Sequence, residues 1–108
     1  MQGEADSKES DIANAYAINL KNFINALRKD FNSPKIHFVA GRVNPPNSKY
    51  PFAEIVRKAQ EECTEDNYAF IDCDNLEKGK DNLHYSTKGI IKMGEKFAET
   101  IETLINKK

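Results

Sequence analysis

The chain has 108 residues, enough for one domain with a single modest core. Its 17 acidic and 16 basic residues give a net charge of −1, which argues against a dedicated nucleic-acid-binding protein because such proteins carry a basic face. No apolar run approaches the roughly 20 residues of a bilayer span, and the acidic, polar opening segment lacks the features of a signal peptide. We therefore expect neither nucleic acid nor a membrane as a partner.

The first half of the chain predicts a helix followed by a short strand. Ser10 or Asp11 is placed to cap the helix, and residues 32–34 would end it. Between them, apolar side chains recur at helical spacing: Tyr16, Leu20, Phe23, Ile24, Leu27 and Phe31. Residues 36–40 have the composition of a strand and are followed by a glycine. Residues 43–50, rich in proline and asparagine, then predict a loop.

The second half predicts two further helices around a second strand. Pro51 suits the first turn of a helix. The apolar side of that helix would hold Phe52, Ile55, Val56 and Ala59. Residues 69–72 predict a strand and residues 76–83 a polar loop, after which Ser86 or Thr87 caps the last helix. The residues expected to face inward from it are Ile90, Met93, Gly94, Phe97, Ile101, Leu104 and Ile105.

This order of elements predicts an α/β fold in which parallel strands lie between layers of helices. Two strands alone make a very narrow parallel sheet, because such sheets are normally wider and buried on both faces. We therefore expect residues 1–108 to be the C-terminal portion of a larger α/β domain whose N-terminal strands precede them.

An acid and a base stand three residues apart in the loop before the last predicted helix, in Asp81-Asn82-Leu83-His84. One turn of backbone at this spacing can hold the carboxylate against one ring nitrogen and leave the other nitrogen free to accept a proton. A hydrolase with a serine nucleophile uses such an acid–base pair. A second polar cluster, Gln2-Gly3-Glu4-Ala5-Asp6, opens the chain.

No serine in the chain has the surroundings of a nucleophile. The serines are Ser7, Ser10, Ser33, Ser48 and Ser86. None lies in a glycine-flanked turn between a strand and a helix, the geometry that exposes a nucleophilic hydroxyl. The sequence therefore predicts an acid and a base with no nucleophile in this chain.

The two cysteines, Cys63 and Cys73, lack the spacing of a zinc site, which takes four ligands in close pairs. Free and partly buried thiols are favoured, with a disulfide as the alternative. We expect no metal site.

Four passages, in order along the chain, share the pattern of one enzyme family. They are Gln2-Gly3-Glu4-Ala5-Asp6, a helix with Tyr16 near its start and Leu27-Arg28 near its end, Val56-Arg57-Lys58-Ala59-Gln60, and a final block with Ile71-Asp72, Asp81-x-x-His84 and Gly94-x-x-x-Ala98. Asp-x-x-His alone is a weak pattern, whereas four blocks in the right order are specific. In these passages the chain resembles the C-terminal half of an SGNH-type hydrolase, in the branch of sialate O-acetylesterases and carbohydrate acetylesterases such as acetylxylan esterases.

The resemblance implies a three-layer, flavodoxin-like α/β fold, here as a partial domain with a short parallel sheet flanked by helices. It implies a carbohydrate O-acetylesterase that acts on an acetylated sugar and requires no cofactor. In the family the nucleophile lies in a Gly-Gln-Ser-Asn-like block upstream of the Gln-Gly-Glu block, and no Gly-Gln-Ser occurs here. Residues 1–108 would then be one portion of a single esterase domain, inactive without the rest.

The resemblance also implies roles for individual residues. His84 would be the general base and acid, and Asp81 would hold its ring and stabilise the imidazolium. Gln2 would donate its side-chain amide to the oxyanion, and Gly3 would allow close approach of the backbone. Glu4 would form hydrogen bonds within the site or serve as a structural carboxylate.

Neighbouring residues are expected to support this site. Arg57 and Gln60 lie three apart on one face of a predicted helix, where we expect a polar network that holds the helix to the active-site loops. Asp6 is expected to fix the opening loop or cap a helix, and Tyr16 to belong to the core.

A function of another class is the alternative. The chain would then be a non-catalytic α/β module that associates with itself or with a partner through its unfinished sheet. A homo-oligomer or a complementing N-terminal segment would be the expected assembly. Its oligomeric state in solution distinguishes the two hypotheses.

Overall fold

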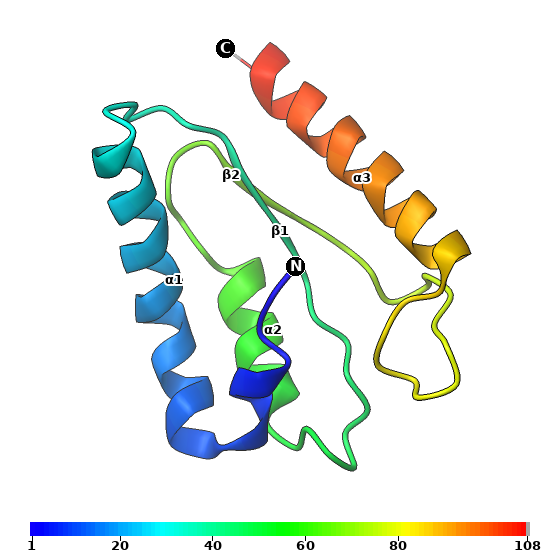
Figure 1. Ribbon diagram of the computed structural model, residues 1–108. Helices are drawn as coiled ribbons and strands as arrows, with labels where there is room; N and C mark the ends of the chain where they lie inside the picture. The colour runs from blue at the N-terminus through cyan, green and yellow to red at the C-terminus, as the bar shows by residue number, and fades with distance from the viewer. Residues whose placement is uncertain (108) are drawn as a thin grey trace.

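Residues 1–107, which the computed structural model describes, form three α-helices around a two-stranded parallel sheet (Figure 1). In chain order the elements are the 3-10 helix η1 (Ala5–Lys8), α1 (Ser10–Asp30), β1 (Phe38–Gly41), α2 (Ala53–Glu61), β2 (Tyr68–Ile71) and α3 (Thr87–Asn106). Phe38 lies opposite Tyr68, and Gly41 lies opposite Ile71. The predicted order of helices and strands is confirmed.

The sheet lies between two helical layers. Figure 1 shows α1 and α2 together on one side of the strands and α3 on the other. Side chains of β1 alternate between these layers, as a strand requires. Phe38 packs against the cluster formed by α1 and α2, whereas its neighbour Val39 packs against the cluster that contains Met93 of α3. The expected α/β class, a short parallel sheet flanked by helices, is therefore confirmed.

Two buried clusters hold the layers together. The larger one joins α1, α2 and the segment after β1, through Ala13, Tyr16, Leu20, Ile24, Val43 and Val56. The smaller one joins the end of β2 and the segment after it to α3, through Ile71, Cys73, Leu76 and Met93. Both clusters include residues just beyond the carboxyl ends of the strands. Core packing therefore fixes the segments from which the site is built.

The caps of the two long helices differ in how well they were predicted. The expectation that Ser10 or Asp11 caps α1 is wrong, because the N-cap is Glu9, whose side chain makes no capping hydrogen bond. Glu9 has an extended backbone directly after η1, so η1 decides where α1 begins. The cap of α3 is confirmed, since Ser86 Oγ accepts the N–H of Gly89 at 3.1 Å.

The strands are displaced from their predicted bounds. β1 begins two residues later than expected and includes Gly41, and β2 begins at Tyr68 and ends before Asp72. The ladder sets these limits, because pairing begins where the N–H of Phe38 donates to the carbonyl of Asn67 at 2.9 Å.

Several apolar side chains expected to face inward are exposed. Their exposed fractions are 55% for Phe23, 70% for Phe31, 58% for Ile90 and 60% for Ile105. Gly94 is exposed as well. The two strands cover only part of each helix, so an apolar stripe wider than the sheet reaches solvent. Within residues 1–107, no helix combines the length and the apolar character needed to cross a membrane.

Candidate active site

The segment between β2 and α3 folds into a tight hairpin that presents His84. Lys78 and Tyr85 form an antiparallel bridge, and the N–H of Gly79 donates to the carbonyl of His84 at 2.8 Å. Asn82 turns the chain with a left-handed backbone at φ 56°, which asparagine tolerates better than most residues. The hairpin holds the ring of His84 just before the first turn of α3.

Asp81 holds the backbone and the ring of His84 at the same time. Its Oδ1 accepts the N–H groups of Leu83 and His84, each at 3.0 Å, and its Oδ2 lies 2.5 Å from Nδ1 of His84. Nδ1 is therefore occupied, while 81% of the histidine side chain is exposed. The two side chains lie in contact as predicted, and Nε2 is left as the ring nitrogen available for proton transfer.

The contact changes the protonation of both groups. The hydrogen bond with His84, helped by the two backbone N–H groups, holds the pKa of Asp81 well below its ordinary value of 3.8. The same hydrogen bond, followed by the charge of Asp81, raises the pKa of His84 above 6.5, and the charge of Glu4 adds to this rise. Such a pair suits a base that must become imidazolium during a reaction.

A cavity of about 540 Å³, hereafter the His84 cavity, joins this hairpin to the opening segment. Glu4 lines it together with His84, so the structure brings one residue of the Gln-Gly-Glu block beside the base. The other residues that line it are Met1, Ala5, Lys8, Tyr50, Leu83, Tyr85, Ile90 and Met93. Tyr50 and Lys8 were not predicted as site residues, because Tyr50 lies in a loop without a motif and Lys8 follows the Gln-Gly-Glu block without belonging to it.

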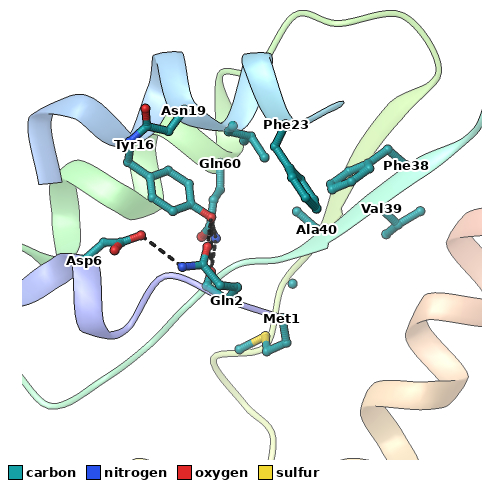
Figure 2. A pocket seen from close by; sticks show the side chains of 12 residues that line it. Met1, Gln2, Asp6, Tyr16, Asn19, Phe23, Phe38, Val39, Ala40 and Gln60 are labelled. Carbon is teal, nitrogen blue, oxygen red and sulfur yellow. Dashed lines mark hydrogen bonds between the residues drawn. The ribbon is translucent and has the colours of Figure 1, made fainter. Parts of the chain in front are cut away.

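Gln2 does not line the His84 cavity. Its Nε2 donates to Oδ2 of Asp6 at 3.0 Å, and its Oε1 accepts the hydroxyl of Tyr16 at 3.1 Å (Figure 2). It lines a separate cavity of about 470 Å³ along β1, hereafter the β1-edge cavity. The amide that would serve an oxyanion is thus held by Asp6, which fixes the opening loop as expected.

Gly3 is needed for packing as well as for backbone freedom. Its φ is 130°, a region that other residues rarely adopt. A Cβ at this position would lie 2.9 Å from Val56 Cγ1 and 3.3 Å from Tyr16 and Val43. The buried core therefore requires a glycine here, and the close approach of its backbone within the site stays a prediction.

Gln60 connects the opening segment to α2 and to the segment after β1. Its Oε1 accepts the N–H of Val43 at 3.0 Å, and its Nε2 donates to the carbonyl of Gln2 at 2.9 Å and to the hydroxyl of Tyr16 at 3.1 Å. Only 1% of Gln60 is exposed. The predicted polar network is confirmed, and Tyr16 is a core residue as expected.

Arg57, the other predicted member of this network, ties α2 to the end of β2. It donates to both carboxylate oxygens of Asp74 at 2.8 Å and to the carbonyl of Val43 at 2.8 Å. Arg42 donates to the same carboxylate at 2.9 Å and to Glu61 at 2.6 Å. The sequence gives no signal for Arg42 or Asp74, because their partners are distant in sequence.

Two polar residues of the hairpin were also missed. Lys78 Nζ donates to the carbonyls of Asn44 and Asn82, which anchors the hairpin to the segment after β1, and burial lowers its pKa. The hydroxyl of Tyr85 is buried and has no hydrogen-bond partner among residues 1–107, and burial raises its pKa. Lysine in a polar loop gives no sequence signal that distinguishes an anchor from a solvated charge.

Two of the serines have structural roles. Ser7 is fully buried and donates to the carbonyl of Gly3 at 2.9 Å, and Ser86 caps α3. No serine of the described chain lines the His84 cavity. Cys63 and Cys73 are free thiols, so the favoured alternative for the cysteines is confirmed. Among residues 1–107, no group of three or more His, Cys, Asp or Glu side chains is arranged to hold a metal ion.

Comparison with known proteins finds a family and a solved structure that are similar to this chain. Residues 1–103 match the family described as carbohydrate esterase, sialic acid-specific acetylesterase. No curated protein matches the chain. A crystal structure of a protein from Arabidopsis thaliana is 27% identical, with a TM-score of 0.87, and the match covers 94% of this chain and 42% of that chain. The chain thus spans less than half the length of this solved relative, and its match over residues 1–103 shows that it belongs to the carbohydrate esterase family of sialic acid-specific acetylesterases.

Proposed function

We propose that the chain supplies the general base and its orienting acid to a carbohydrate O-acetylesterase, whose serine nucleophile comes from polypeptide outside these 108 residues. The observation that carries this proposal is the 2.5 Å contact between Oδ2 of Asp81 and Nδ1 of His84, beside a cavity that Glu4 shares. Family membership and the 42% coverage of the solved relative support it. The substrate is an O-acetylated sugar, and O-acetylated sialic acid is the first to assay because the family description names sialic acid.

In the proposed reaction His84 moves one proton in each direction. The serine oxygen attacks the acetyl carbonyl carbon while its proton passes to Nε2. The bond from the carbonyl carbon to the sugar oxygen then breaks, and His84 returns the proton to that oxygen. Water repeats the sequence on the acetyl-serine and releases acetate. Asp81 keeps Nδ1 protonated and stabilises the imidazolium formed in each half.

The opening segment is proposed to form the oxyanion side of this site. Gly3 and Glu4 lie on the backbone that Gln60 fixes through the carbonyl of Gln2. The side-chain amide of Gln2 carries two N–H donors, of which one is held by Asp6, so the second would serve the oxyanion. A preorganised donor at this place contributes about 3 kcal/mol to transition-state stabilisation in serine hydrolases.

A chimeric single chain tests this function. The matched portion of the Arabidopsis thaliana protein is replaced by residues 1–108, and acetate release from O-acetylated sialic acid is compared with that of the unaltered host. We expect turnover that falls on the order of 10⁶-fold in His84→Ala and on the order of 10⁴-fold in Asp81→Asn, because both act in one unit with the serine. Turnover that survives in His84→Ala would contradict the proposal.

The 108 residues alone provide the complementary measurement. They should release acetate from O-acetylated sialic acid at the rate of buffer, because the base has no hydroxyl to activate. Hydrolysis by the isolated chain that disappears in His84→Ala would show that the nucleophile lies within it and would refute that part of the proposal.

A further inference from the structure

Two residues of the His84 cavity, Lys8 and Tyr50, have no task in the proposed reaction. Lys8 is the last residue of η1, and Tyr50 lies in the loop that precedes α2. The N–H of Phe52 donates to the carbonyl of Ser7 at 2.9 Å, which ties this loop to η1. Two segments that are distant in sequence are thereby held together, and both side chains reach the same cavity.

The ring of Tyr50 positions the ammonium group of Lys8. Nζ of Lys8 lies 5.4 Å from the ring centroid, within the range of a cation–π contact. Tyr50 is only 8% exposed, and its N–H donates to the carbonyl of Pro46 at 3.1 Å, so packing and backbone both restrain the ring. No ion pair within residues 1–107 includes Lys8. Its charge is therefore held in place without a carboxylate to neutralise it.

The charges around the cavity are separated along η1. Glu4 is the N-cap of η1, and its charge contributes to the raised pKa of His84. Lys8 follows four residues later, which separates the two backbone positions by about 8 Å along the helix axis. Lys8 is also the one lysine or arginine that lines the cavity. A substrate whose negative group is distant from its reacting ester would therefore be oriented with that group at Lys8.

The sugar in the family description has such a distribution of groups. Sialic acid carries a carboxylate on its anomeric carbon, at one end of the molecule, and most of its hydroxyl groups lie toward the other end. Hydrogen bonds from an ammonium group to a carboxylate are charge-assisted and stronger than those between neutral groups. A neutral acetylated sugar offers no group that could form them.

We infer that Lys8, positioned by Tyr50, binds the carboxylate of O-acetylated sialic acid and selects this acidic sugar over neutral acetylated sugars. The carboxylate accepts hydrogen bonds from Nζ, while the acetyl ester lies beside His84. The volume of the cavity, about 540 Å³, is that of a small-molecule site. The inference rests on the proposed function, because Lys8 would select the substrate of the reaction that His84 serves.

Kinetics of the chimeric chain with two matched sugars test the inference. One sugar is O-acetylated sialic acid, and the other is the same compound with a carboxamide in place of the carboxylate. For the acid, Lys8→Met should raise KM about tenfold and leave kcat within about twofold, because the contact is made equally in the ground state and the transition state. For the carboxamide, KM should change less than about twofold. Added salt should reduce the preference for the acid, because Lys8 is exposed and its charge is screened.

Two further variants separate charge recognition from folding. Lys8→Arg keeps the charge and should retain most of the preference for the acid. Lys49→Met removes an exposed charge next to Tyr50 that does not line the cavity, and it should leave KM for both sugars unchanged. Lys8 and Lys49 are both exposed, so their substitution should disturb stability little, and thermal unfolding verifies this.

Equilibrium binding to the 108-residue chain separates this inference from the proposed function. The chain alone should not release acetate, so O-acetylated sialic acid itself serves as the probe in a nuclear magnetic resonance titration of the His84 ring. We expect saturable binding that is about tenfold weaker for the carboxamide, and about tenfold weaker for the acid in Lys8→Met.

Each outcome bears on one of the two proposals. Lys8→Met with equal effects on both sugars, or an original chain that prefers the acid in neither measurement, would overturn the inference. An active chimera whose KM and binding do not depend on Lys8 removes this inference alone. An inactive chimera, together with Lys8-dependent binding of the acid, removes the proposed function alone. An inactive chimera without binding removes both.

Discussion

Asp81 is the residue whose two oxygens do different tasks. One oxygen satisfies two backbone N–H groups of the hairpin, and the other meets the ring of His84. The two backbone hydrogen bonds restrain the carboxylate, so its contact with the ring of His84 costs little further side-chain freedom. A preorganised acid of this kind keeps one tautomer of the ring and stabilises its charged form.

The ionisation of His84 should depend on this carboxylate. Since Asp81 raises the pKa of His84 above 6.5, Asp81→Asn should lower the midpoint at which the ring resonances titrate. Nuclear magnetic resonance of the isolated chain measures the midpoint, and the resonances of His37, the second histidine, provide the internal reference. In the chimera, activity requires the neutral ring of His84, so activity should rise with pH. In Asp81→Asn this rise should occur at lower pH. An unchanged midpoint would show that the pair does not persist in solution.

Gly3 offers a second test at the scale of single residues. Gly3→Ala should lower the free energy of unfolding by about 1–3 kcal/mol, because φ is 130° and the new Cβ would collide with Val56. Gly94→Ala is the matched control, since nothing lies within 4 Å of its Cβ position in α3, and it should stabilise the chain by about 0.5–1 kcal/mol. Urea unfolding measures both. Equal effects of the two substitutions would contradict the packing argument.

Among the elements, α2 links the opening segment to the sheet. Gln60 alone bonds to Gln2, Tyr16 and Val43, which belong to three different parts of the chain. Because Gln60 is buried, its loss leaves those groups without water to replace it. The position of the Gln-Gly-Glu block relative to β1 thus depends on one amide of α2.

Gln60→Met measures this dependence with little change of volume. The N–H of Val43 would lose its partner, and unfolding should become easier by about 1–3 kcal/mol. The amide of Gln2 should also exchange with solvent faster, since its segment loses an anchor. Lys58→Met, at an exposed position of the same helix, should change stability by less than about 0.5 kcal/mol. A neutral effect of Gln60→Met would show that water satisfies these groups.

At the scale of the whole molecule, a charge network ties helix α2 to the segments that follow both strands of the sheet. Arg57 of α2 and Arg42, just after β1, meet on Asp74, just after β2. The hydrogen bonds from Arg57, ahead of the charges of both arginines, lower the pKa of Asp74 below 3.8. Each element thus contributes one group at the carboxyl end of the sheet, the end from which the His84 hairpin leaves.

Asp74→Asn should show this network in the pH dependence of stability. The folded pKa of Asp74 lies below its ordinary value, so its contribution is present above pH 3.8 and is lost as pH falls through the lowered value. At pH 7 the variant should be less stable by about 2 kcal/mol, and the difference should shrink below pH 3.8. Glu54→Gln removes the other carboxylate on Arg57, 84% exposed, and should cost less than about 0.5 kcal/mol. A difference that persists unchanged at low pH would contradict this origin.

The features predicted well are those that a few consecutive residues decide. Asp81 and His84 are three residues apart, and the cap of α3 joins Ser86 to Gly89, so the local backbone suffices for both. Helix α3 and the order of the elements follow from apolar spacing. The strand limits and the cap of α1 were missed, because the pairing of β1 with β2 and the geometry of η1 set them.

Sequence by itself determined the α/β order, the esterase resemblance and the acid–base pair, since each rests on local contacts or on ordered motifs. Tertiary structure decided that Gln2 bonds to Asp6 while Glu4 lines the cavity beside His84, and that Phe23 is left exposed beside β1. The physical reason is that these contacts depend on which segments pack together across the sheet. Helical periodicity locates an apolar face, but only the neighbouring elements determine whether that face is covered.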